Sequence, residues 1–201
     1  MKYEVLLIGV GGEGVLTSQS VIARAANLDS HYVRGVQLHG LAQRGGSVPT
    51  SVRFGAEKYL SSPHIMQANA DLVIAFEPLE AVRAVYFARK DKTNFLINLD
   101  PDPPAYSYIL KIPYPSEKEI ERRIKPFAKN IHTLRASEIA KKEFGKQIFA
   151  NTILIGAAFN LDLLPLKEES LKKAIEISAP RRAVSENLKA FEIGKEYFKN
   201  S

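Results

Sequence analysis

Short apolar runs alternate with amphipathic segments over the first two thirds of the chain. The runs Tyr3–Val10 and Asp71–Phe76 are nearly continuous rather than helically spaced, which is typical of buried strands. Strands are predicted at Tyr3–Val10, His31–Leu38, Val48–Phe54, Asp71–Phe76, Asn94–Leu99 and Asn130–Leu134. Helices are predicted between them, at Ser18–Ala26, Pro78–Arg89 and Glu117–Ala128. This alternation predicts an α/β fold, a Rossmann-like open, mostly parallel sheet with helices on both faces.

The remainder of the chain, from about residue 137, has the pattern of helices alone. Asn151–Leu164 is apolar on nearly all sides and is therefore expected to be buried, with Pro165 ending it. Gly156 within it would let a neighbouring element approach closely. A last helix carries Phe191 on its apolar face. We therefore predict one domain over residues 1–201, with a helical C-terminal part at about 137–201.

Composition removes several classes of function. The chain has 201 residues, 45% of them hydrophobic and 25% charged, which suits one ordinary globular domain. It has no cysteine, so a disulfide, a thiolate nucleophile and a cysteine-held zinc ion or iron–sulfur cluster are excluded. The four histidines are scattered without an i, i+4 pair, and no metal site is predicted. The longest apolar run, Ile153–Phe159, is too short to cross a bilayer, so we expect a cytoplasmic protein without a membrane segment.

The formal net charge of +6 raises the question of an anionic partner. The basic residues are interspersed with acidic ones, as in Glu117–Lys125 and Lys167–Lys173. This distribution is usual for solvated helix faces, whereas nucleic-acid binding normally needs basic residues clustered on one face. No nucleic-acid partner is predicted.

The most distinctive local motif is a glycine-rich turn between the first strand and the first helix. Its glycines are Gly9, Gly11, Gly12 and Gly14. Glycine permits a tight turn and a close backbone approach to an anion, and the helix N-terminus that follows favours negative charge. The spacing fits the dinucleotide-binding fingerprint. A turn that merely packs strand against helix is the alternative.

An NAD site also needs an acidic residue at the end of the second strand, to hold the ribose hydroxyls. None follows that strand here, and Asp29 comes before it. Glu13 places a carboxylate within the loop, where it would repel a pyrophosphate unless it turned outward. Ordinary dinucleotide binding is thus disfavoured, although Arg34 or Arg44 could serve a 2′-phosphate.

A second motif, residues 39–47, holds an arginine, two glycines and a serine in sequence. These residues are Arg44, Gly45, Gly46 and Ser47. A guanidinium with neighbouring backbone amides can grip a phosphate or a carboxylate, although the segment could equally be a hairpin turn with an exposed arginine. If both glycine-rich loops end neighbouring strands, they line one crevice of the type in which open α/β sheets bind ligands.

Other polar residues carry weaker signals. Glu77 and Glu80 flank a proline at the start of a predicted helix, where acids commonly interact with the helix dipole. Asp100 either faces the crevice or shapes the turn before a proline. Arg181 and Arg182 suit a solvated surface. No Ser, His and acid arrangement is visible, and no catalytic residue is predicted in this chain.

Three segments together resemble the gamma-type domain of the 2-oxoacid:ferredoxin oxidoreductase family. They are G-x-G-G-x-G-V at residues 9–15, H-G-x-A-Q-R-G-G-S-V at 39–48 and V-R-F-G at 52–55. The resemblance extends over the whole chain, and its middle segment is closest to the indolepyruvate branch. The family pattern has Gln where this chain has Glu13, and a carboxylate there disfavours a direct contact with a negative group at that position.

The resemblance implies oxidative decarboxylation of an aryl pyruvate with coenzyme A, giving an acyl-CoA, carbon dioxide and reduced ferredoxin. It implies that thiamine diphosphate and [4Fe–4S] clusters belong to a larger alpha subunit, through which ferredoxin is reduced, and that this chain alone binds no cofactor. It assigns the two glycine-rich loops a role in binding coenzyme A phosphates or shaping the substrate entrance, with Arg44 supplying charge. A free-standing NADP- or flavin-binding oxidoreductase and a non-catalytic regulatory module are the alternatives.

Overall fold

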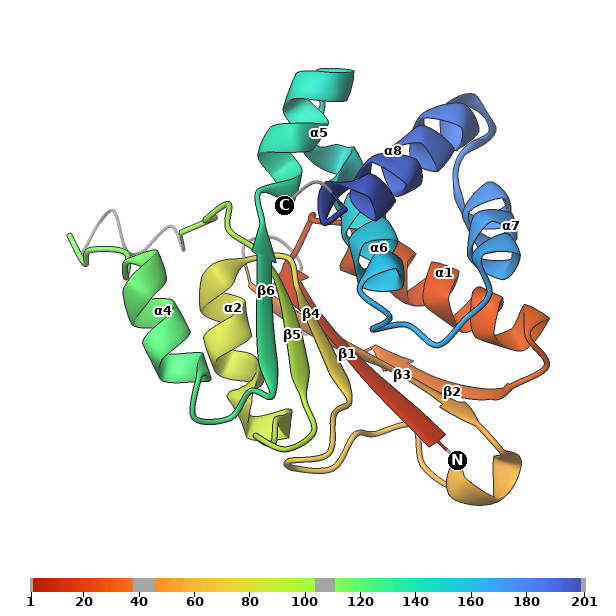
Figure 1. The fold of residues 1–201 in the computed structure, drawn as a ribbon, viewed down its shortest axis with the longest axis horizontal. Coiled ribbons are helices and arrows are strands. Elements are labelled where there is room, and N and C mark those ends of the chain that lie inside the picture. Colours follow the sequence, from red (N-terminus) through yellow and green to blue (C-terminus); the bar gives the residue numbers. More distant parts are fainter. Residues whose placement is uncertain (1, 38–45, 104–110, 200–201) are drawn as a thin grey trace.

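A computed structural model describes residues 2–37, 46–103 and 111–199 as a six-stranded sheet flanked by helices (Figure 1). The strand order is β2-β3-β1-β4-β5-β6. The strands are β1 (Lys2–Val10), β2 (Tyr32–Gln37), β3 (Ser47–Gly55), β4 (Leu72–Ala75), β5 (Asn94–Asn98) and β6 (Asn130–Leu134). The apolar runs predict all six strands, with ends that agree within one residue.

The sheet is parallel except at one strand. β1, β4, β5 and β6 pair in parallel, whereas β3 runs antiparallel to both of its neighbours, β1 and β2. The predicted α/β class with a mostly parallel sheet is confirmed. Because β3 lies between β2 and β1, β2 occupies an edge of the sheet instead of the place beside β1.

Helices cover both faces of the sheet (Figure 1). On one face, a core of β1, β4 and β5 side chains packs against α2 (Pro78–Arg83) and α4 (Glu117–Ile124). The larger core on the other face involves five helices. These are α1 (Val15–Leu28), α5 (Ala136–Phe144), α6 (Ala150–Asn160), α7 (Glu168–Ser178) and α8 (Val184–Tyr197). Within the described ranges, no helix combines the length and apolar character that a bilayer crossing requires.

Three predicted helix ends are wrong. α2 ends at Arg83 and continues only as a 3-10 turn to Phe87, and α4 ends at Ile124. α6 ends at Asn160, so Pro165 does not terminate it. The chain leaves α6 at Asp162, which has a left-handed φ of 55°, and the amide of Leu163 donates back to the carbonyl of Ala158 at 2.9 Å. This is the geometry of a helix end that glycine usually provides.

α6 and α8 cross in direct backbone contact. A Cβ atom added to Gly156 of α6 would lie 2.1 Å from the carbonyl oxygen of Phe191, and one added to Gly194 of α8 would lie 2.0 Å from that of Ile153. No side chain fits at either position without moving a helix. The predicted close approach at Gly156 is thus confirmed, and Gly194 is its counterpart.

A buried ion pair fixes the opposite end of the sheet. The Nε of Arg53 on β3 donates to the Oε1 of Glu4 on β1 at 2.6 Å, and both side chains are almost fully buried. Arg53 also donates to the carbonyl of Ser62, which holds the 56–70 connection against the sheet. Lys2 and Lys92 reach the same carboxylate from the surface.

We predict that Arg53→Met lowers the free energy of unfolding by about 3 kcal/mol, because it leaves a buried carboxylate without its closest cation. Guanidinium denaturation measures this value. Arg89→Met is the matched control, since Arg89 forms an exposed pair with Asp91 and its loss should cost under about 1 kcal/mol. Equal losses in the two variants would show that the buried pair contributes no more than a surface one.

Candidate functional site

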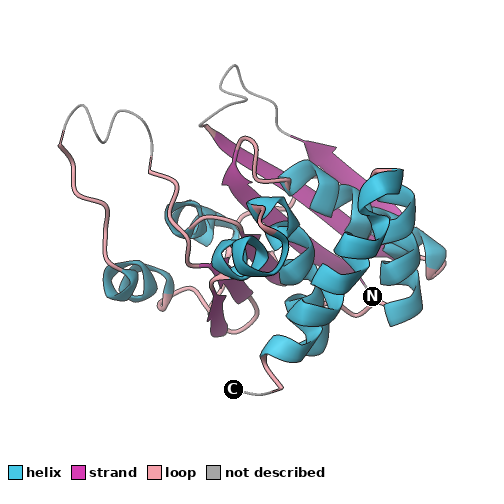
Figure 2. Ribbon diagram, turned by 90° about the horizontal axis from the view of Figure 1, so that it is seen from above, coloured by secondary structure: helices cyan, strands magenta, loops and turns pink. Residues whose placement is uncertain are grey.

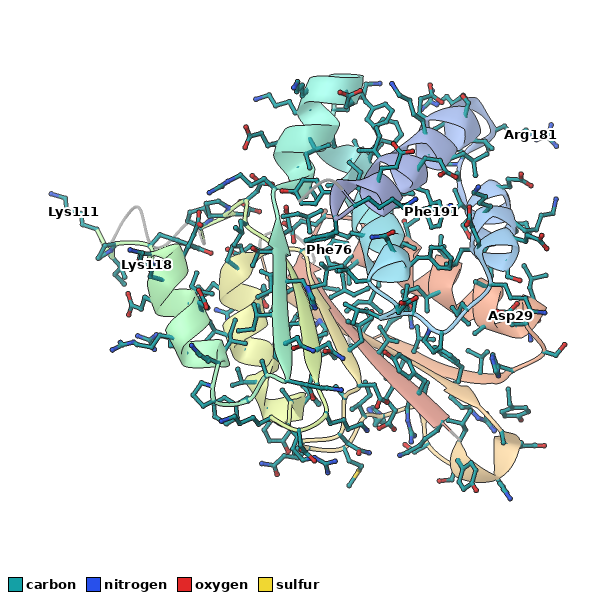
Figure 3. All side chains as sticks on the ribbon, viewed as in Figure 1. Asp29, Phe76, Lys111, Lys118, Arg181 and Phe191 are labelled. Atoms are coloured by element: carbon teal, nitrogen blue, oxygen red, sulfur yellow. The ribbon has the colours of Figure 1, made fainter. Side chains whose placement is uncertain are left out.

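A cavity of about 820 Å³ lies at the carboxyl edge of the parallel strands. Figure 2 views the molecule from this side, and Phe76, at the end of β4, is labelled in Figure 3. The walls come from the glycine-rich loop, the strand ends and the starts of several helices. Lining residues include Gly11, Gly12, Glu13, Gly14, Thr17, Ser18, Asn98, Asp100, Asp102, Ser137, Asn151, Thr152, Ala183 and Asn187. Open α/β sheets bind ligands at this edge.

The glycine-rich loop is held by bonds within the protein. The amide of Gly11 donates to the carbonyl of Gly46 at 3.0 Å, which joins this loop to the start of β3. Gly12 and Gly14 have positive φ angles of 115° and 80°, so the turn needs glycine at both positions. Gly14 is also the N-cap of α1, and its Cα packs against the side-chain amide of Asn151 on α6.

Glu13 folds inward instead of pointing away from the loop. Its Oε2 accepts a hydrogen bond of 2.6 Å from the amide of Val10. Gly9 makes room for this carboxyl group, because a Cβ there would lie 2.5 Å from Oε2. Burial raises the pKa of Glu13 to about 7, and the nearby carboxylates of Glu77, Asp102 and Glu80 add to the rise.

Four helices present their N-terminal ends to the cavity. Gly14 begins α1, Ser137 lies in the first turn of α5, Ala150–Thr152 form that of α6, and Ala183 precedes α8. Asp100 caps the first turn of α5, because its Oδ2 accepts hydrogen bonds from the amides of Ser137 at 2.9 Å and Glu138 at 3.3 Å. The N-caps of α1, α6 and α8 provide no such side-chain bond. In the first turn of α6, however, the amide of Thr152 donates to the side chain of Asn151, and the first turn of α8 carries Glu186. The first turn of α1 has no acidic residue, so its dipole favours negative charge in the cavity.

Ser18 offers a hydrogen-bonding group that the described part of the protein does not use. It lies in α1 at the cavity wall and is fully buried, yet its hydroxyl has no partner among the described residues. Buried polar groups are nearly always hydrogen-bonded, so this hydroxyl is unusual among the described residues. The described lining contains no lysine or arginine.

The structure brings together only some of the residues predicted from the two glycine-rich motifs. Gly11, Gly12 and Gly14 line the cavity, whereas Gly9 lies beneath it, against the side chains of Glu13 and Phe76. Gly46 contacts the first loop through its carbonyl. The hydroxyl of Ser47 donates to Glu80 on α2. Arg44 and Gly45 lie outside the described residues.

The other polar residues singled out in the sequence have identifiable places. Glu77 is the N-cap of α2 and accepts from the amide of Glu80, the role predicted for an acid at that position. Asp29 accepts from Lys167 and Ser170 and so fixes the start of α7. The guanidinium of Arg34 lies over the ring of Tyr32 on β2. Arg181 lies at the periphery of the molecule (Figure 3).

Sequence reasoning missed the part of the site that comes from the C-terminal helices. Asn151 packs on Gly14, and the hydroxyl of Thr152 donates to Asn187 of α8 at 2.7 Å. The sequence contained one signal: polar Asn151 and Thr152 begin a segment that is otherwise apolar on all sides. Within the described residues, no group of three or more His, Asp or Glu side chains is arranged to hold a metal ion.

Comparison with known proteins gives consistent results over the whole chain. Residues 4–197 match the family described as pyruvate ferredoxin/flavodoxin oxidoreductase. The chain is 35% identical to the indolepyruvate oxidoreductase subunit IorB of Pyrococcus horikoshii, over 96% of this chain and 94% of that protein.

Solved structures share the fold. The gamma subunit of a keto/oxoacid ferredoxin oxidoreductase from Geobacter sulfurreducens superposes with a TM-score of 0.71 at 20% identity and covers 99% of each chain. The 2-oxoglutarate:ferredoxin oxidoreductase of Magnetococcus marinus, solved with 2-oxoglutarate, coenzyme A and succinyl-CoA bound, has a TM-score of 0.72 at 20% identity. That match spans all of this chain and 31% of the other.

We predict that Glu13→Gln changes how stability depends on pH. The folded protein keeps a proton on Glu13 up to about pH 7, whereas the unfolded chain releases it near 4.5, so this group lowers stability as pH rises between those values. The free energy of unfolding of the variant, relative to that of the wild type, should therefore be up to about 3 kcal/mol higher at pH 8 than at pH 5. Guanidinium denaturation at each pH measures this difference. Exposed Glu121→Gln should show no such difference, and an equal effect of Glu13→Gln at both pH values would contradict the prediction.

Proposed function

The chain belongs to the pyruvate ferredoxin/flavodoxin oxidoreductase family, and we propose that it is the non-cluster subunit of a 2-oxoacid:ferredoxin oxidoreductase acting on an aryl pyruvate. The 35% identity to an indolepyruvate oxidoreductase subunit along nearly the full length supports that substrate class. The chain has no cysteine, so the iron–sulfur clusters must be held by a larger partner subunit, which would also carry thiamine diphosphate.

The overall reaction of such a complex consumes one 2-oxoacid, one coenzyme A and two oxidised ferredoxins. It yields one acyl-CoA, one carbon dioxide, two reduced ferredoxins and a proton. Bound thiamine diphosphate supplies the carbanion chemistry of decarboxylation. The present chain supplies neither that chemistry nor the redox centres, so we expect it to have no turnover by itself.

The contribution of this chain is to bind the phosphates of coenzyme A at the carboxyl edge of the sheet. The observation that carries this proposal is the cavity of about 820 Å³ at this edge, where the glycine-rich loop meets the N-terminal end of α1 and where Ser18 of the wall has a buried hydroxyl without a partner among the described residues. Backbone amides and helix dipoles at such ends favour phosphate oxygens. The Magnetococcus marinus enzyme, part of which has the same fold, was solved with coenzyme A bound, and this supports the choice of ligand.

We expect Arg44, which lies outside the described residues, to supply the positive charge of this site, as the family resemblance implies. The described lining of the cavity has no basic residue, and Arg44 precedes Gly46 by two positions in the sequence. The carbonyl of Gly46 is bonded to Gly11 of the glycine-rich loop, so the second motif meets the first at this point. A guanidinium binds phosphate through paired hydrogen bonds.

The sheet disfavours a free-standing dinucleotide-dependent enzyme. In the dinucleotide fold, the second strand lies beside the first and its end carries the acid for the ribose. Here the antiparallel β3 separates β2 from β1, and β2 ends at Gln37 without an acid.

We predict that Arg44→Ala raises the KM of the assembled complex for coenzyme A about tenfold, the effect of losing one charge-assisted contact. The KM for the 2-oxoacid should stay unchanged in the same steady-state assays. Arg123→Ala is the matched control, because Arg123 pairs with Glu119 on the other face of the sheet. An unchanged KM for coenzyme A in the Arg44 variant would count against the proposal.

We predict that Ser18→Ala has opposite effects on folding and on binding. Losing an unpartnered buried hydroxyl should raise the free energy of unfolding by about 1 kcal/mol, while the lost ligand bond should raise the KM for coenzyme A several-fold, about 1 kcal/mol. Ser20→Ala on the same helix serves as the control, since its hydroxyl bonds to the Leu16 carbonyl. An unaltered KM for coenzyme A in Ser18→Ala would show that this hydroxyl does not contribute to binding.

A further inference from the structure

The loop that faces the proposed anion site contains its own acid. Glu13 lines the cavity, and its carboxyl group is bonded to the amide of Val10 within the loop, directly before the first turn of α1. In this position it lies beside backbone groups that would otherwise favour an external anion. When it is ionised, its negative charge therefore repels an anion that binds in the cavity.

The groups around Glu13 do not neutralise it. Glu77 faces it from the N-cap of α2, Glu80 from the same helix and Asp102 from the segment after β5. The cation next to these carboxylates, Arg83, pairs with Glu80. Glu77 accepts a hydrogen bond from the hydroxyl of Tyr114. No lysine or arginine of the described residues acts on Glu13 directly.

We propose that Glu13 makes anion binding in the cavity dependent on pH: its neutral carboxyl group permits coenzyme A to bind, and its ionised form opposes binding. This inference rests on the proposed function, because it concerns the same site. It assigns Glu13 a positioning and specificity role, since the carboxyl group sets the charge of the loop and takes no part in bond making.

The range over which binding changes is physiological. The pKa of Glu13 is raised to about 7 by burial and by its acidic neighbours. Below that value the carboxyl group is mainly protonated, and above it the loop acquires a negative charge. Binding of an anion should therefore raise the pKa of Glu13 further, and a proton should be taken up when coenzyme A binds near pH 7.5.

The test compares the wild-type complex with Glu13→Gln between pH 6 and pH 8.5. The KM of the wild type for coenzyme A should rise about tenfold more over this range than that of the variant, as expected for two charges about 10 Å apart at a protein surface. Coenzyme A titrates identically in both assays, so the ratio of the two profiles isolates Glu13. Glu121→Gln, on an exposed position of α4, should retain the wild-type profile.

A second measurement does not depend on turnover. Calorimetric titration of the complex with coenzyme A at pH 7.5, in two buffers of different ionisation enthalpy, should reveal proton uptake in the wild type and much less in Glu13→Gln. Identical profiles and identical proton uptake in the two proteins would overturn the inference. If Arg44→Ala still weakens coenzyme A binding in that case, the proposed function stands alone; if neither Arg44→Ala nor Ser18→Ala has an effect, both proposals fall.

Discussion

The close crossing of α6 and α8 determines how the C-terminal helices sit over the sheet. Backbone contact at Gly156 and Gly194 leaves no space for a Cβ atom on either helix. This contact sets α6 with its first turn on the glycine-rich loop, where Asn151 packs against Gly14, and it places Asn187 of α8 beside Thr152. The cavity has these two helices as one wall and the strand ends as the other. A wider separation of the helices would move the polar groups of that wall away from the loop.

The cavity can favour an anion even though acids line it, because those acids are engaged differently. Asp100 is bonded to the first turn of α5 and uses its charge there. Glu13 is bonded within its own loop and is partly protonated near neutral pH. The first turn of α1 contains no acidic residue, so its partial positive charge acts on the cavity. The charge of the cavity is then set by the balance between the dipole of α1 and the ionisation of Glu13.

Hydrophobic patterning predicted the sheet better than the helix ends. Buried strands such as β4 and β5 are bounded by polar or turn residues, so their ends are visible in the sequence. α6 ends instead at a left-handed Asp162, where no glycine marks the stop, and the prediction followed Pro165. Gly194 and Ser18 were not predicted either. Gly194 matters because it contacts Ile153 on another helix, and Ser18 because the folded chain leaves its buried hydroxyl without a partner among the described residues. Neither feature is encoded in a local sequence pattern.

The glycine-rich motif predicted the shape of its loop, and the contacts of each glycine explain why. Gly9 is required because the carboxyl group of Glu13 occupies the space of its missing side chain, and Gly14 because Asn151 does the same. The amide of Gly11 is bonded to Gly46. These glycines thus join the loop to its own acid, to α6 and to β3. The loop is therefore held in place by bonds within the protein, and it forms the wall of the cavity beside the N-terminal end of α1.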